Sequence, residues 1–239
     1  MSHTTQRRGI GPEYRGKELI VLAMIPSQYK NLPGIRDAMR ELALKMLDYG
    51  PQNWISRNFT EITYPGLGAS QDFVNWMHQI LPEFTTRYIM SKVGSQSSVV
   101  TAVYTDSTKV VALISDLKKN WLVRNREKGY PISIVISALI DDVHDCCRKT
   151  DLTEHTYLHS MGFFGKVREL PSEDELSLVT MCGHGLIAVN RVRHLLKSVK
   201  SGAMTPEDAA GNLARPCACG IVNRERAKEV FQRLAAGDS

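Results

Sequence analysis

The sequence predicts an α/β fold: one domain in which a small mixed sheet is flanked by helices, with a helical C-terminal part that carries a Cys/His metal site. Short β-branched runs alternate with amphipathic segments of helical period. The 239 residues can bury one sizeable core without a second domain. Residues 1–16 are polar and contain Gly and Pro, which predicts a flexible arm, so a single metal-binding domain spans 17–239.

The strands are predicted from short apolar runs that are bounded by turn residues. The first strand follows the arm, and two further runs are rich in Val, Ile, Thr and Ser. A fourth run precedes a Cys-Gly-His turn. The four predicted strands are 18–24, 98–104, 132–137 and 176–181.

The helices are predicted from apolar residues at three- and four-residue spacing and from their start signals. Asp106 or Ser107 could cap one helix, Thr205 with Pro206 begins another, and Asn223 can cap the last. The predicted helices are 35–50, 71–92 with an interruption at Pro82, 107–129, a segment through Cys147, 186–199, 205–214 and 224–235.

The composition is that of a globular protein, with 43% hydrophobic and 23% charged residues. No run approaches the roughly 18 apolar residues that span a bilayer, and the N-terminus has no apolar stretch typical of a signal peptide. We therefore expect a soluble, cytoplasmic protein without membrane contact. Five cysteines are an odd number, which argues against a secreted disulfide framework and leaves thiols for metal or chemistry.

Two short cysteine motifs predict the main site. Cys182 and His184 form C-x-H, and Cys217 and Cys219 form C-x-C, 35 residues later. Thiolate and imidazole are the ligands that zinc prefers, and thiolates also hold iron–sulfur clusters. Neighbouring glycines let both turns bend so that the side chains converge. The two turns are therefore expected to fold against each other around a common centre.

Two metals fit these motifs at the level of sequence. If all four groups bind, three thiolates and one imidazole close a tetrahedral zinc site of structural type. If only Cys182, Cys217 and Cys219 bind, they can hold a cubane iron–sulfur cluster with one iron open to substrate, and His184 is then a nearby acid or base. Buried, unliganded cysteines are the alternative to both.

A second group lies between Glu154 and His159. His155 and His159 are four residues apart and would share one face if the segment is helical, so they are candidate metal ligands. His155 and Glu154 are also candidate catalytic residues, because hydroxyl groups and glycines around them suit the lining of an active site. An ordinary surface or core histidine is the alternative.

A third group, 141–147, contains three Asp, one His and two Cys just after a predicted strand. Ligands gather beyond the carboxyl ends of strands in open α/β sheets, and Cys147 could then be an additional cluster ligand. A charged helix face explains the three acids equally well.

The segment 180–185, Thr-Met-Cys-Gly-His-Gly, resembles the Met-Cys-Gly-His segment of proline racemases and hydroxyproline epimerases. In that family a thiol at a helix start removes the α-proton of the substrate. The resemblance implies a cofactor-free thiol racemase that uses Cys182, and a thiolate at a helix start would be stabilised there. Pro216-Cys217 lies nearer than that family's second catalytic cysteine, and Cys219 has no counterpart in it.

These patterns favour a metal-dependent enzyme with an iron–sulfur cluster or zinc as Lewis acid and a histidine as acid or base. The expected substrate is small and polar or anionic, and a lyase, hydratase or C–S bond reaction fits it. The alternative to enzymes is a structural-zinc module whose basic C-terminal helices contact nucleic acid or an acidic partner, because 190–239 holds nine Lys and Arg against five Asp and Glu. A homo-oligomer is possible.

Overall fold

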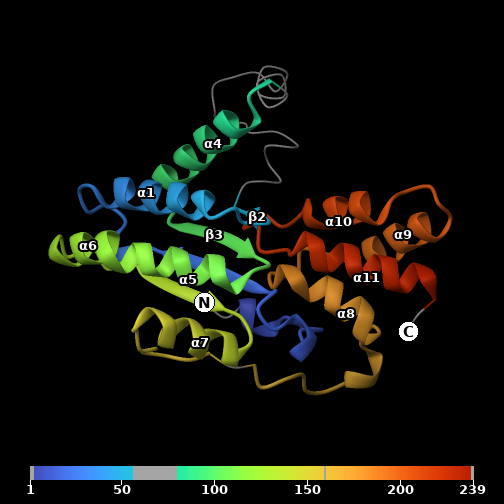
Figure 1. Cartoon of the computed structure of the whole chain (residues 1–239). Coiled ribbons are helices and arrows are strands. Elements are labelled where there is room, and N and C mark those ends of the chain that lie inside the picture. Colours follow the sequence, from blue (N-terminus) through green and yellow to red (C-terminus); the bar gives the residue numbers. More distant parts are fainter. Residues whose placement is uncertain (1–2, 56–79, 159, 238–239) are drawn as a thin grey trace.

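The protein is described by a computed structural model that covers residues 3–55, 80–158 and 160–237 (Figure 1). Its sheet has four strands in the order β2-β3-β1-β4. The strands are β1 (Leu19–Met24), β2 (Asn53–Trp54), β3 (Val99–Tyr104) and β4 (Ser133–Ser137).

All pairings among the described strands are antiparallel, so the prediction of a mixed sheet is wrong. On the central strand β1, Val21 lies opposite Ala102 of β3 and Ile136 of β4. Between β1 and β3 the chain passes through both α1 and α4, and not through a single crossover helix of the kind that makes neighbouring strands parallel.

The larger hydrophobic core lies on one face of the sheet. Alternate residues of β1, namely Leu19, Val21 and Ala23, enter it, as the two-residue repeat of a strand requires. The helices that contribute residues to this core are α1 (Ile35–Asp48), α4 (Pro82–Gln96), α5 (Ser107–Asp116), the π-helical turn η4 (Leu117–Leu122) and α7 (Ile140–Thr150). The short helix α6 (Val123–Glu127) follows η4 directly.

The second core packs on the other face of the sheet, where Ile20 of β1 lies opposite Val103 of β3. In Figure 1 its helices gather beside the end of β3. They are α8 (Glu173–Val179), the 3-10 turn η6 (Thr180–Cys182), α9 (Val189–Lys200), α10 (Pro206–Ala214) and α11 (Arg224–Ala236). Four further 3-10 turns are His3–Gln6, Pro12–Tyr14, Ser27–Tyr29 and Val167–Glu169.

Most predicted elements are confirmed, and three helices have the caps that the sequence predicts. The Asp106 carboxylate accepts a hydrogen bond from the amide of Thr108 at 2.8 Å, and the Thr205 hydroxyl accepts one from the amide of Asp208 at 3.1 Å. Asn223 Oδ1 accepts from the first turn of α11. The first part of the predicted helix 71–92 lies outside the described residues.

The predicted strand 176–181 is wrong, because this segment forms α8 and η6. Ser172 and Glu175 form a capping box at the start of α8, with each side chain accepting from the other residue's amide. This start signal in the sequence outweighs the β-like appearance of the short apolar run that follows it. Cys182 therefore ends a 3-10 turn and does not stand between a strand and a helix.

The N-terminal segment, for which the composition predicts a flexible arm, contacts both the sheet and the C-terminal helices. The guanidinium of Arg7 pairs with Glu18, and both side chains are at most 2% exposed. The Arg8 amide donates to the hydroxyl of Thr180 at 2.8 Å. None of the described helices is long and apolar enough to cross a membrane.

Candidate metal centre

The C-x-H and C-x-C turns lie against each other, as the motifs predict. The Cys219 sulfur is 3.6 Å from Nδ1 of His184, and the Cys217 sulfur is 3.7 Å from that of Cys219. Cys182 hydrogen-bonds with Cys217. The four side chains therefore form a continuous series of contacts: Cys182, Cys217, Cys219, His184.

The C-x-C turn is held by backbone contacts to the sheet. The amide of Cys217 donates to the carbonyl of Ala214 at 2.9 Å, and Gly220 then has φ of +68°. A Cβ built on Gly220 would lie 2.0 Å from the carbonyl oxygen of Trp54, so only glycine allows this close approach to β2. The Thr101 hydroxyl of β3 donates to the Cys219 carbonyl, which ties the turn to a second strand.

The C-x-H turn is held by η6 and by two glycines in the left-handed region. Gly183 ends η6 with φ of +69°, and Gly185 has φ of +71°. The Cys182 side chain points into the second core with no exposed area, whereas His184 is exposed. This turn therefore brings one buried side chain and one exposed side chain to the C-x-C turn.

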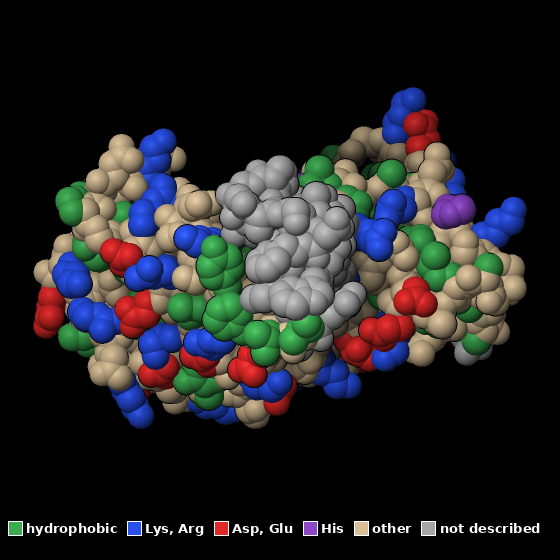
Figure 2. Space-filling model, turned by 90° about the horizontal axis from the view of Figure 1, so that it is seen from above, with side chains coloured by type: hydrophobic (Ala, Val, Ile, Leu, Met, Phe, Trp, Pro, Cys, Tyr) green, Lys and Arg blue, Asp and Glu red, His purple; other side chains and the backbone are tan. Residues whose placement is uncertain are grey.

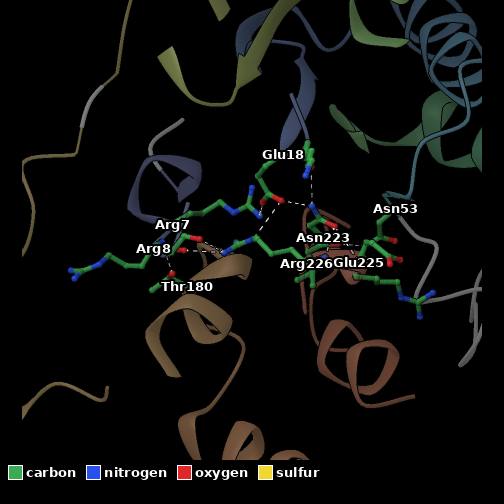
Figure 3. Close-up of polar contacts among 12 residues, drawn as sticks. Arg7, Arg8, Glu18, Asn53, Thr180, Asn223, Glu225 and Arg226 are labelled. Atoms are coloured by element: carbon green, nitrogen blue, oxygen red, sulfur yellow. Dashed lines mark hydrogen bonds and ion pairs between the residues drawn. The ribbon is translucent and has the colours of Figure 1, made fainter. Parts of the chain in front are cut away.

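A buried ionic cluster fixes both turns relative to the N-terminal segment (Figure 3). Glu18 precedes β1, and one oxygen of its carboxylate accepts a hydrogen bond from the guanidinium of Arg7. Nε of Arg226 lies 3.4 Å from the other oxygen. Arg226 also donates to the carbonyl oxygens of Arg8 and Gly9, each at 3.1 Å.

The same cluster reaches both cysteine turns through the backbone. Asn223, the cap of α11, donates to Glu18 and stands four residues after Cys219. Thr180, which begins η6, accepts from the amide of Arg8, as Figure 3 shows. The elements that carry the cysteines are therefore held by contacts between residues that are far apart in the sequence.

The three sulfurs differ in how readily they ionise. The hydrogen bond from Cys217 lowers the pKa of Cys219. The pKa of Cys182 is raised by the hydrogen bond between Cys182 and Cys217 and by the burial of Cys182. The hydrogen bond with Cys182 lowers the pKa of Cys217, but that with Cys219 and burial outweigh it and raise this pKa to about 11. Of the three sulfurs, negative charge therefore resides most easily on Cys219, which lies next to His184.

Within residues 3–55, 80–158 and 160–237, no three or more His, Cys, Asp or Glu side chains are grouped so that they could hold a metal ion as they stand. The neighbouring members of the series touch pairwise, but they are not arranged around one point.

His155, another predicted ligand, does not join this series. The described residues 152–158 are irregular, so His155 does not lie on the helix that the four-residue spacing predicted. His155 is exposed, and no described interaction links it to the cysteines. His159 lies outside the described residues.

Glu154 belongs to a separate cluster on α7. Its Oε1 lies 2.9 Å from Nδ1 of His144, and its carboxylate also hydrogen-bonds with Cys147. The hydrogen bond from its own backbone is the largest of the effects that lower the pKa of Glu154, and those from His144 and Cys147 also lower it. His144 belongs to the group 141–147 that the sequence singled out. Its contact with Glu154 depends on a change of chain direction at Asp151, which has φ of +51°.

Part of the basic character of 190–239 is taken up by burial or by ion pairs with acids in the folded chain. Arg224 and Arg226 are buried. Three further cations pair with acids: Arg193 with Glu175, Lys228 with Glu207 and Glu225, and Arg233 with Asp174. On the face that Figure 2 shows, positive and negative side chains are interspersed. Lys197, Lys200 and Arg215 remain exposed.

Comparisons with models of protein families, with curated proteins and with solved structures found no match for this chain. The case for a function therefore rests on the residues and their geometry.

Proposed function

We propose that this chain is a zinc-binding protein in which Cys182, His184, Cys217 and Cys219 hold one Zn²⁺. The ion would act as a structural joint between the sheet and the C-terminal helices. The observation that carries the proposal is the pair of short distances, 3.7 Å between Cys217 and Cys219 and 3.6 Å between Cys219 and His184.

These separations fit ligands that share one tetrahedral ion. With zinc–sulfur bonds of about 2.3 Å and a zinc–nitrogen bond of about 2.0 Å, two sulfurs lie about 3.8 Å apart, and sulfur lies about 3.5 Å from nitrogen. Cys182 and His184 would then have to move so that both reach the same ion as Cys217 and Cys219. Zinc would replace the thiol protons, since it binds the thiolate form.

The same distances favour zinc over an iron–sulfur cluster. Each thiolate of a cubane binds a different iron, so its cysteine sulfurs stand farther apart than two sulfurs on one ion. Three thiolates and one imidazole also fill all four positions of a zinc ion, and a catalytic zinc keeps one position for water or substrate. A closed site of this composition supports a structural role.

Racemase chemistry receives less support than zinc binding. A base that removes an α-proton must reach the substrate as a thiolate, but Cys182 has no exposed area. Its hydrogen bond with Cys217 and its burial also raise its pKa.

The test is elemental analysis of the protein purified without added metal. We expect one zinc per chain in the wild type and no iron or sulfide. His184→Ala changes the one exposed ligand and should weaken zinc affinity at least about tenfold while the fold persists. Cys147→Ser, which changes a partly exposed cysteine outside the series, should keep the full zinc content. Iron with sulfide, absence of any metal, or equal zinc affinity in all variants contradicts the proposal.

A second candidate function is supported by the His144–Glu154 contact. A carboxylate at Nδ1 orients a histidine so that its Nε2 can move a proton, and His144 is half exposed. We propose His144 as a general base toward a small polar or anionic substrate, with Glu154 as its positioning residue. A panel of hydroxy and thio acids should reveal turnover that His144→Ala abolishes, and turnover at the wild-type rate in this variant would reject it.

A further inference from the structure

β4 is an edge strand whose outer side has no partner among the described strands. All five of its residues, Ser133–Ser137, are partly exposed. From 132 to 140 the chain contains no charged residue and no proline. Exposed edge strands are normally protected by charges, prolines, bulges or a covering element, and this stretch of sequence supplies neither charge nor proline.

The direction of the backbone groups of β4 follows from the register of the sheet. On β3, the carbonyls of Thr101 and Val103 accept hydrogen bonds from the β2 side, at 3.0 and 2.7 Å. Along a strand the backbone groups alternate between its two neighbours. Val100, Ala102 and Tyr104, which alternate with these two residues, therefore direct their backbone groups to β1.

The same alternation extends across β1 to β4. Ser133, Val135 and Ser137 direct their backbone groups to β1, and Ile134 and Ile136 direct theirs to the open edge. The edge therefore presents two amides and two carbonyls, placed symmetrically about Val135.

We propose that a second copy of this chain pairs with this edge, so that two β4 strands run antiparallel with Val135 on the two-fold axis. Ile134 then lies opposite Ile136 of the partner subunit, and the reverse pair forms the second half. Each of the two pairs exchanges two hydrogen bonds, which satisfies every outward amide and carbonyl of both strands. The two sheets join into one of eight strands.

The charges beside the edge fit a second copy. α7 follows β4 after two residues and begins with Asp141, which is exposed although Arg15 lies 3.9 Å from it. Its last turn carries the exposed Arg148, which pairs with Asp145 of the same helix, and Lys149. The axis is perpendicular to the sheet, so the two copies of α7 lie antiparallel on the same side. The acidic start of each helix then faces the basic end of the other.

The test begins with sedimentation of the full-length protein, whose chain mass is 26.8 kDa. A species of twice this mass is expected at micromolar concentration. Val135→Lys should weaken dimerisation at least about tenfold, because two ammonium groups would meet across the axis. Val135→Thr, a β-branched residue without charge, is the matched control and should keep the dimer. A wild-type monomer at high micromolar concentration overturns the proposal.

Cross-linking tests the register itself. In the proposed dimer the Val135 residues of the two subunits form a non-hydrogen-bonded pair. The Cα separation of such a pair, about 4.5 Å, suits a disulfide. Val135→Cys should therefore form a covalent dimer under mild oxidation. Ser133→Cys should not, since its copies lie about 13 Å apart along the strands. The wild type under the same oxidant gives the background of the native cysteines, and equal cross-linking of all three proteins rejects this register.

Discussion

The Cys219 sulfur lies 3.6 Å from Nδ1 of His184, although 35 residues and two helices separate them in the chain. These residues belong to the short C-x-H and C-x-C motifs, and the fold brings the two motifs into contact. The contact exists because each turn is attached to something rigid: the C-x-C turn to β2 and β3, and the C-x-H turn to η6 and the N-terminal segment.

Removal of zinc should loosen the C-terminal helices first. A structural ion contributes its binding energy to folding, so a strong chelator should lower the melting temperature. Hydrogen exchange should accelerate in α10 and α11, which flank the C-x-C turn, more than in β1 and β3. Uniform protection with and without chelator would count against a structural ion.

Gly220→Ala should destabilise the protein strongly. The new Cβ would overlap the Trp54 carbonyl, and φ of +68° is unfavourable for alanine, so we expect a loss of at least about 3 kcal/mol in the free energy of unfolding. Gly129 has the same φ but no atom within 4 Å of its Cβ position, so Gly129→Ala should cost about 1 kcal/mol. Urea unfolding measures both, and equal losses would show that packing against β2 is unimportant.

Glu18→Gln should be among the most destabilising single changes. Arg7 and Arg226 are buried against this one carboxylate, and its loss would leave two buried cations without an anion. The expected cost is about 3–5 kcal/mol. Glu173→Gln removes the exposed partner of Arg8 and should cost less than about 1 kcal/mol. Chemical unfolding of the pair compares them, and a small effect of Glu18→Gln would contradict the role of the cluster.

Acid should remove the stabilisation from the Asp116–Lys45 pair. The hydrogen bond from Lys45 lowers the pKa of Asp116, so the pair stabilises the fold above the unfolded pKa of about 3.9, and this contribution is lost as pH falls through the lower folded pKa. The same contact raises the pKa of Lys45, so the contribution is also lost in strong alkali.

Because both side chains of this pair are partly exposed, Asp116→Asn should cost at most about 1 kcal/mol at pH 6. The difference from the wild type should shrink toward pH 2.5 in urea titrations. A difference that stays constant over this range would mean that the ion pair contributes nothing.

The sequence was sufficient for elements whose signals are local. The period of 35–48, the β-branched run of β3 and the caps Asp106, Thr205 and Asn223 all predicted what the structure shows. The prediction for 176–181 failed because a short, mostly apolar run suits a strand as well as a buried helix. The antiparallel sheet could not be read from the order of elements, since strand direction depends on long-range packing.

The candidate site divides in the same way. C-x-H and C-x-C are local motifs, and glycines mark both turns, so Cys182 and Cys219 could be found from sequence. The partner of Glu154 could not, because the contact with His144 depends on how the chain turns at Asp151. The buried pairing of Glu18 with Arg226 was also missed, since these two residues stand more than 200 positions apart in the sequence.

X-ray absorption at the zinc edge tests the central claim most directly, because it reports the ligands of the ion itself. We predict one zinc per chain with three sulfurs at about 2.3 Å and one nitrogen at about 2.0 Å. In Cys219→Ser the sulfur count should fall to two. A first shell of oxygen and nitrogen only, or a spectrum unchanged by Cys219→Ser, would contradict the account.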